Sequence, residues 1–181
     1  FKLPVYMTPG TYHPDKIGMV ETLHKGNCHK NFSIGDIVIE PVPVPHDAKE
    51  PCQYIFCHNE CRAGVLTDLG HVTAFVKERY RCCDLMLLEC NYDQKMLAEG
   101  PYPRALKNRV GGKLGHLSND QAAELAGHFD LDRLKYLIVS HVSEKNNRPD
   151  LALGSMKSIL SHWSGNLLVS SQAEGFPWIT L

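Results

Sequence analysis

Three residues combine the side chains and the positions of a metal site: His46, Asp68 and His141. Each ends an apolar, strand-like stretch and opens into a turn, in the segments PVPHDAKEP, GVLTDLGHVT and LIVSHVSEKNN. Imidazole and carboxylate together suit Zn, Mn or Fe(II). Open coordination positions are typical of catalysis, because a metal can make hydroxide from bound water. We therefore predict these three residues as metal ligands and Asp68 also as a catalytic residue. The alternative for Asp68 is a helix N-cap before Leu69.

His116 is the candidate for proton transfer. It lies in KLGHLSN, just before a helix N-terminus, where backbone N–H groups and the helix dipole favour anions. A phosphate docked there would be within reach of a histidine that can donate a proton. The alternative is a loop histidine with no catalytic role.

A local basic cluster precedes His116 and includes Arg104, Lys107 and Arg109. Positive charge beside a metal site suits a phosphodiester substrate, although a solvated helix face would have the same composition. We predict a set of substrate contacts around this cluster, and its members are Tyr102, Arg104, Lys107, Arg109, Ser118, Asn119, Asn146 and Asn147. The last two could equally be turn residues before Pro149.

Composition places the chain among ordinary globular domains. Its 181 residues fit a single domain, with 43% hydrophobic and 22% charged residues. The net charge of -1 provides no global attraction to nucleic acid, so phosphate binding must be local.

No apolar run reaches the length of a membrane span, and the N-terminus, which lacks Met, does not resemble a signal peptide. We expect a cytoplasmic protein, since seven cysteines without a C-x-x-C pair fit a reducing compartment. Residues 57–61 read as a hairpin turn rather than a zinc knuckle.

Apolar patterning predicts strands that alternate with helices, which indicates an α/β layered fold with a mixed sheet. The proline-rich stretch 37–44 is expected to be an edge strand. The near-continuous apolar run 84–89 is expected to be a strand buried on both faces. A capping box at Ser118 and Gln121 predicts a helix start. The other expected elements are a hairpin around Asn59, helices at 72–80 and after Pro149, and strands at 134–140, 167–170 and 178–180.

Six segments, taken together and in order, resemble the metallo-β-lactamase superfamily, in particular its YycJ/WalJ-like branch of nucleases. They are PHDAKEP, LTDLGHVT, LECNYD, GxYPxxLKxRV, GHLSNxxAA and SHVSxxNNxP. The resemblance implies a four-layer αβ/βα sandwich with two metals at the sheet edges. It implies that His46 ligates one metal, that Asp68 bridges both and that His141 ligates the second. It also implies that His116 acts near the scissile phosphate.

The H-x-H-x-D-H motif of that superfamily is missing from this sequence. We therefore expect residues 1–181 to be one domain that corresponds to about the C-terminal two-thirds of a family member. An incomplete sandwich should expose apolar sheet surface, which a missing N-terminal segment, another chain or a second copy in a homo-oligomer would cover.

The resulting functional hypothesis is a metal-dependent hydrolase, a phosphodiesterase or nuclease that uses metal-activated hydroxide. Its cofactor would be a divalent metal, with two ions (Zn, Mn or Fe) in the complete protein, and its substrate a nucleic acid or another phosphodiester. Two alternatives remain open. One keeps the fold and changes the substrate to a small ester or thioester, and the other is a non-catalytic binding module.

Overall fold

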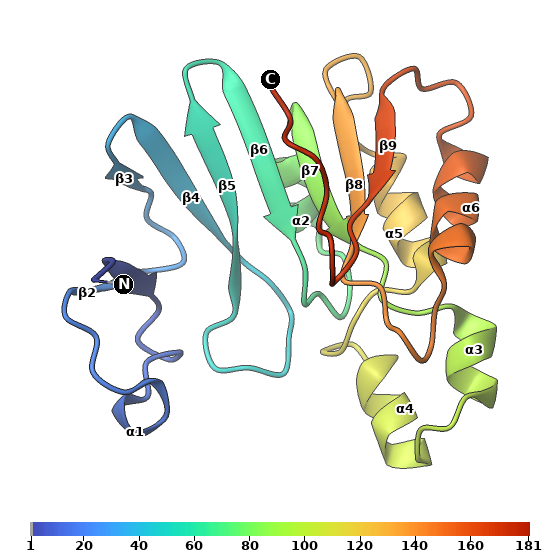
Figure 1. Ribbon diagram of the computed structural model, residues 1–181, viewed down its shortest axis with the longest axis horizontal. Helices are drawn as coiled ribbons and strands as arrows, with labels where there is room; N and C mark the ends of the chain where they lie inside the picture. Colours follow the sequence, from blue (N-terminus) through green and yellow to red (C-terminus); the bar gives the residue numbers. More distant parts are fainter. Residues whose placement is uncertain (1) are drawn as a thin grey trace.

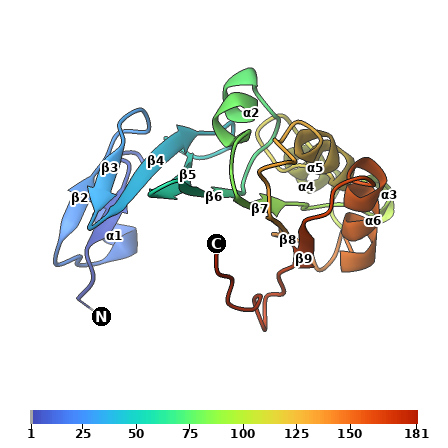
Figure 2. The same cartoon turned by 90° about the horizontal axis from the view of Figure 1, so that it is seen from above.

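The computed structural model describes residues 2–181, and they form one large sheet with helices on one face (Figure 1, Figure 2). The strands are β1 (Val5–Met7), β2 (Leu23–Lys25), β3 (Phe32–Ile34), β4 (Ile37–Pro43), β5 (Cys52–His58), β6 (Cys61–Leu66), β7 (Leu85–Glu89), β8 (Tyr136–Ser140) and β9 (Asn166–Val169). The helices are α1 (Pro14–Ile17), α2 (Ala74–Tyr80), α3 (Gln94–Glu99), α4 (Arg104–Val110), α5 (Asn119–Ala126) and α6 (Pro149–Ile159). No helix among these residues is long and apolar enough to span a membrane.

The large sheet is mixed, as the sequence predicts. Its seven strands follow chain order from β3 to β9. The pairs from β3 to β6 are antiparallel, and the pairs from β6 to β9 are parallel. β1 and β2 form a separate two-stranded parallel sheet at one end. Because β4, β6, β7 and β8 run in the same direction, their carboxyl ends all reach one edge of the sheet.

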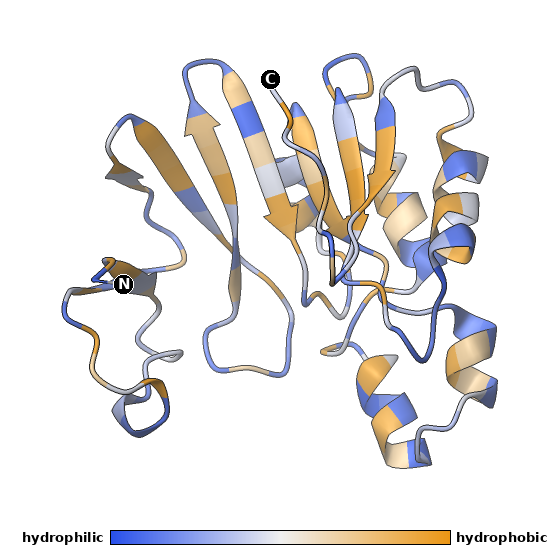
Figure 3. Cartoon of the chain, in the orientation of Figure 1, coloured by the Kyte–Doolittle hydropathy of each residue, from blue (hydrophilic) through white to orange (hydrophobic). Residues whose placement is uncertain are grey.

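The hydrophobic core lies between the sheet and the helices (Figure 2). The central strands contribute fully buried side chains such as Leu66, Met86 and Leu137. From the helical layer, Tyr80 of α2 and Leu125 of α5 are also buried against them. α5 starts at the predicted capping box, in which Ser118 and Gln121 each bond the other's backbone. Figure 3 shows that the central strands β7 and β8 are mostly apolar, whereas α5 and α6 carry both apolar and polar residues.

Two strands differ from their predictions. β4 is not an edge strand along its whole length, since β3 pairs with Ile37–Ile39. Pro41 and Pro43 lie beyond this short partner and pair with β5 alone, which is compatible with proline at a sheet edge. β7 is not buried on both faces, because Leu85 and Leu87 are half-buried whereas Met86 and Leu88 are buried. A strand with helices on one side only alternates in burial.

The C-terminal third also differs in detail. α6 begins at Pro149 as predicted and buries Ala152 and Met156. The predicted strand at 178–180 is irregular chain instead, and Trp178 is fully exposed. The segment after β9 crosses the open face of the sheet (Figure 1), and its one bridge, between Ser171 and Gly175, lies within the segment itself. A strand needs a pairing partner, and the local sequence at 178–180 does not show whether one is present.

The open face of the sheet is apolar. Tyr54, Val65, Leu87 and Ile138 lie in one row across four strands. The first three are half-buried, whereas Ile138 is fully buried. Phe56, two residues from Tyr54, is 37% exposed. This is the kind of sheet surface that the sequence predicts to be left open.

Gly64 offers a direct test of the packing between sheet and helices. A Cβ at Gly64 would lie 2.5 Å from Met86 Sδ and 2.8 Å from Tyr80 Cδ1. We expect Gly64→Val to lower the free energy of unfolding by about 1–3 kcal/mol through overpacking. Gly154→Ala in α6 is the matched control, because nothing lies within 4 Å of its added Cβ. This control should stabilise by up to about 1 kcal/mol through helix propensity. Denaturant unfolding of both variants measures the difference, and equal stabilities would contradict the packing described here.

Candidate metal centre

The candidate site lies where the parallel strand ends meet. Asp68 follows β6, Glu89 is the last residue of β7, and His141 follows β8. His46 comes three residues after β4 and reaches the same edge. The loop that carries His116 is held against the end of β7, since Asn91 N–H donates to the Leu117 carbonyl.

Asp68 is at the centre of this group. Its Oδ1 atom lies 3.8 Å from His46 Nε2, 3.7 Å from His116 Nδ1 and 3.9 Å from His141 Nδ1. Ligand atoms of Asp68, Glu89, His116 and His141 all lie within 4.8 Å of one another. The structure therefore brings together the three residues predicted as ligands and the predicted proton donor.

Glu89 was not among the predicted residues, and it organises the whole cluster. Its carboxylate is fully buried and accepts five hydrogen bonds. Three come from the backbone N–H groups of Asp68, Leu69 and Leu117, at 2.9–3.0 Å. The other two come from Nδ1 of His116 at 3.2 Å and Nδ1 of His141 at 3.0 Å. A lone acid that ends an apolar strand could have signalled this role, because such a charge needs partners.

These contacts keep Glu89 ionised. Burial alone would raise its pKa, but hydrogen bonds from His116, His141 and the Leu117 N–H outweigh burial and lower the pKa to about 2. The same hydrogen bond raises the pKa of His141, against the opposing effect of burial. Both imidazoles donate through Nδ1, so the Nε2 atoms are left for a ligand. In metal sites a carboxylate commonly orients histidine ligands in this way.

Backbone conformation at the site is unusual at two positions. Asp68 has φ 53° and His141 has φ 52°, in the left-handed region that non-glycine residues seldom occupy. Such a conformation costs on the order of 1–3 kcal/mol and persists where neighbours fix it. The bond from Asp68 N–H to Glu89 and the bond from Asn91 Nδ2 to the His141 carbonyl supply that restraint.

Two cavities adjoin the cluster, and His116 lines both. One, of about 230 Å³, is lined by His46, Tyr102 and Arg109 among others. Arg109 donates to Asp47 there and lowers the pKa of that carboxyl by this hydrogen bond. The other, of about 360 Å³, is lined by His141, Asn146 and again Tyr102. The structure thus places three predicted substrate contacts, Tyr102, Arg109 and Asn146, beside the cluster.

The remaining predicted contacts lie elsewhere. Arg104 is exposed on α4, and Lys107 of the same helix donates to the Ala98 carbonyl. Ser118 is buried as the N-cap of α5. Asn119 and Asn147 are buried and bond each other through their side-chain amides. In this structure these last three side chains serve internal hydrogen bonds, and their contact with substrate stays a prediction.

The donor set fits a divalent metal. Glu89 Oε1 already accepts two hydrogen bonds and Oε2 accepts three. Asp68 and the imidazoles are therefore the groups in the cluster whose lone pairs remain free to coordinate a metal. Mixed imidazole and carboxylate ligands at a partly exposed strand edge are what catalytic Zn, Mn or Fe sites require. Asp68 is 41% exposed at its side chain, so the site is open to solvent.

The buried carboxylate gives a stability prediction. Glu89→Ala removes the acceptor of five buried donors, and we expect the free energy of unfolding to fall by about 3–5 kcal/mol. The control is Glu124→Ala on the exposed face of α5, which should change stability by less than about 0.5 kcal/mol. Denaturant unfolding at neutral pH measures both, and a Glu89→Ala loss no larger than that of the control would refute the organising role of Glu89.

Comparison with known sequences identifies relatives. The family model for the beta-lactamase superfamily domain matches residues 3–141. Exodeoxyribonuclease YycJ of Bacillus anthracis is 33% identical over 167 residues, which is 88% of this chain and 62% of that protein. Exodeoxyribonuclease WalJ of Streptococcus pneumoniae (strain D39) is 36% identical over 132 residues, 73% of this chain and 49% of that protein. The chain therefore spans between about half and three-fifths of the length of these relatives.

Solved structures agree on the fold. The metallo-beta-lactamase fold protein YhfI from Bacillus subtilis superposes with a TM-score of 0.71 at 15% identity, covering 97% of this chain and 64% of that one. Zn(2+)-bound PqqB from Methylobacterium extorquens gives a TM-score of 0.65 at 14% identity, with 97% and 64% coverage. With the family match and the two relatives, the conclusion is that this chain belongs to the metallo-β-lactamase superfamily and is a YycJ/WalJ-like member of it.

Proposed function

We propose that the protein is a divalent-metal-dependent hydrolase that cleaves phosphodiester bonds in nucleic acid. The observation that carries this proposal is the position of Arg109 and Tyr102 in a cavity that His46 and His116 also line. A cation and hydrogen-bond donors beside a metal-ligand cluster suit a phosphate group. The two relatives named exodeoxyribonucleases support the same class of substrate.

In this proposal His46, Asp68 and His141 hold the metal, and two ions are expected in the complete protein. When bound, a divalent metal lowers the pKa of water and neutralises charge on the phosphoryl oxygens. Asp68 would be a ligand shared by the two ions, since its Oδ1 atom lies 3.8 Å from His46 Nε2 and 3.9 Å from His141 Nδ1.

His116 is proposed as the general acid. Its Nδ1 hydrogen bond to Glu89 leaves Nε2 as the atom that delivers a proton to the leaving oxygen of the cleaved bond. The ionised Glu89 fixes the orientation of the His116 ring through this hydrogen bond, as the buried aspartate does for histidine in serine hydrolases. His116 lines both cavities, so this proton is positioned between the two parts of a bound substrate.

The open apolar face of the sheet bears on what else packs against this chain. We infer that further residues of the same protein, or another chain, cover the half-buried row of Tyr54, Val65 and Leu87 in the complete assembly. The shorter length of this chain relative to its relatives supports the first of these.

Substitution of His116 tests the general acid. In the full-length protein we expect His116→Ala to lower kcat on an oligodeoxynucleotide by about 10²–10⁴-fold, the usual contribution of one acid–base group. Bound metal, measured by inductively coupled plasma mass spectrometry, should stay at the wild-type level. His128→Ala, an exposed histidine after α5, is the control and should retain wild-type kcat. Wild-type turnover by His116→Ala would remove His116 from the mechanism, and loss of metal would make it a ligand instead.

Substitution of Arg109 tests the phosphate contact. Arg109→Ala should raise KM for DNA several-fold and reduce the slope of log KM against log salt by up to about one, because one cationic contact is lost. Arg81→Ala, an exposed arginine after α2, should leave the slope unchanged. If no nucleic acid or model phosphodiester is hydrolysed with Zn, Mn or Fe(II), the phosphodiesterase proposal fails and small esters and thioesters become the substrates to assay.

A further inference from the structure

An ion pair joins α4 to the loop that carries His46. Arg109 Nε donates to Asp47 Oδ2, and both residues line the 230 Å³ cavity that His46 and His116 also line. Among residues 2–181, neither terminal nitrogen of Arg109, Nη1 or Nη2, takes part in a hydrogen bond or an ion pair. The Arg109 side chain is 67% exposed. Its guanidinium is therefore held at Nε, while the edge formed by Nη1 and Nη2 is available to another acceptor.

Folding stability does not account for this pair. Ion pairs between exposed side chains contribute about 0–1 kcal/mol to stability, and α4 buries none of its residues. A carboxylate in a cavity proposed to bind phosphate also repels that phosphate, because the two charges have the same sign. A role at the site, rather than in folding, explains an aspartate at this position.

The backbone around Asp47 is fixed by the loop that carries His116. The Asp47 N–H donates to the Leu114 carbonyl at 2.9 Å. His46 Nδ1 lies 3.0 Å from the Gly115 carbonyl, which can only accept, so Nδ1 is the donor of this bond. The second carboxylate oxygen of Asp47, Oδ1, lies 3.5 Å from His46 Nε2. Asp47 is thus located between the guanidinium of Arg109 and the nitrogen of His46 that faces Asp68.

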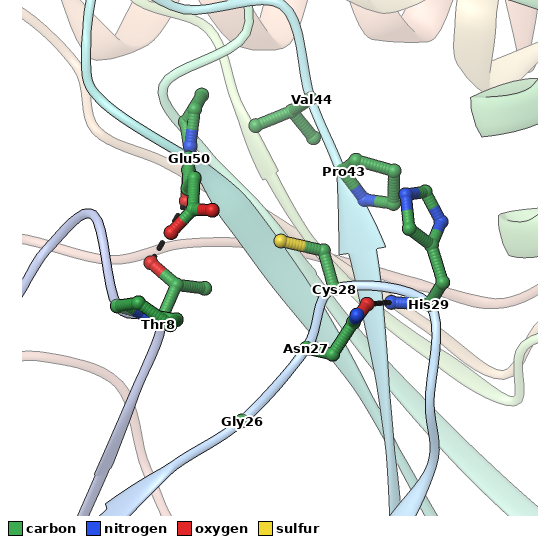
Figure 4. A pocket seen from close by; sticks show the side chains of 10 residues that line it. Thr8, Gly26, Asn27, Cys28, His29, Pro43, Val44 and Glu50 are labelled. Carbon is green, nitrogen blue, oxygen red and sulfur yellow. Dashed lines mark hydrogen bonds between the residues drawn. The ribbon is translucent and has the colours of Figure 1, made fainter.

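The far end of the same loop is anchored as well. The Val44 N–H donates to the Pro51 carbonyl at 3.2 Å and closes the loop. Figure 4 shows Glu50 near its C-terminal end, where the Glu50 carbonyl accepts from Thr8 Oγ1 at 3.1 Å. Asp47 therefore presents its carboxylate to Arg109 from a backbone that is held on both sides.

We propose that Asp47 is a positioning residue, which holds Arg109 at Nε and directs the Nη1 and Nη2 edge of its guanidinium toward a phosphate of the substrate. The inference rests on the proposed phosphodiesterase function and adds the residue that orients its phosphate contact. A guanidinium presents five N–H donors in a fixed planar fork, so one part can bond a carboxylate while the other bonds two phosphate oxygens. The same geometry explains an arginine rather than a lysine at position 109, since an ammonium has no such fork.

Removal of the Asp47 carboxylate distinguishes positioning from simple charge repulsion, because the two effects have opposite signs. Loss of a negative charge beside phosphate would by itself lower KM, whereas loss of the orienting contact raises KM. In the full-length protein with its metal, we expect Asp47→Ala to raise KM for an oligodeoxynucleotide by about 3–10-fold and to keep kcat within about twofold of wild type. Asp36→Ala, an exposed aspartate between β3 and β4, is the control and should leave KM unchanged.

A second variant tests whether Asp47 acts through Arg109. Once Arg109→Ala has removed the guanidinium, Asp47→Ala should cause no further rise in KM. Bound metal, measured by inductively coupled plasma mass spectrometry, should stay at the wild-type level in all of these variants. A KM at or below wild type in Asp47→Ala, an equal rise with and without Arg109, or loss of metal from Asp47→Ala would overturn the positioning role and leave the hydrolase proposal standing.

Binding measurements separate this inference from the proposed function, because they need no cleavage. Inorganic phosphate is titrated by calorimetry into the full-length protein with its metal. Asp47→Ala and Arg109→Ala should both weaken phosphate binding by about threefold or more, and this result would support the positioning role even if no phosphodiester is cleaved. Unchanged or tighter binding by Asp47→Ala, with weaker binding by Arg109→Ala, would refute it.

Discussion

The candidate site depends on one buried carboxylate. Glu89 ends the central strand β7, and its two oxygens hold backbone from the loops after β6 and after α4 together with the rings of His116 and His141. Burying a charge is costly, and here hydrogen bonds offset the cost and keep the carboxylate ionised. Because five donors converge on two atoms, displacement of any one loop would leave a buried charge with fewer partners. The geometry of the whole site is thus coupled to a single side chain.

The sheet explains why these residues converge. β4, β6, β7 and β8 all point the same way, so residues that are far apart in sequence follow strand ends at one edge. The strands are rigid, being packed against α2 and α5, whereas the loops that follow them carry the functional side chains. The left-handed conformations of Asp68 and His141 are the local cost of turning both side chains toward a common point.

Much of this arrangement is readable from sequence, because strand-end placement is a local signal. The apolar runs before Asp68 and His141, the capping box at Ser118 and the proline at the start of α6 each act over a few residues, and the structure has the corresponding elements.

Glu89 is different. It carries the same strand-end signal, but its function lies in contacts with groups 20–52 positions away in the sequence. The sequence likewise does not show that the side-chain amides of Asn146 and Asn147 differ in their hydrogen bonding. The positions of Asn119 and Cys90 in the fold decide that Asn147 is the one with partners. The irregular chain at 178–180 has strand-like composition and no pairing partner among residues 2–181.

The central claim is that the group around Asp68 binds a divalent metal. The most direct measurement is anomalous diffraction from crystals of the protein grown with manganese, with data collected near the manganese absorption edge. We predict an anomalous peak within about 2.0–2.4 Å of an Asp68 carboxylate oxygen and of Nε2 of His46 or His141, with Glu89 outside the coordination sphere and still bonded to both Nδ1 atoms. A fully occupied metal at any other position, or a peak coordinated by Glu89 in place of the histidines, would contradict it.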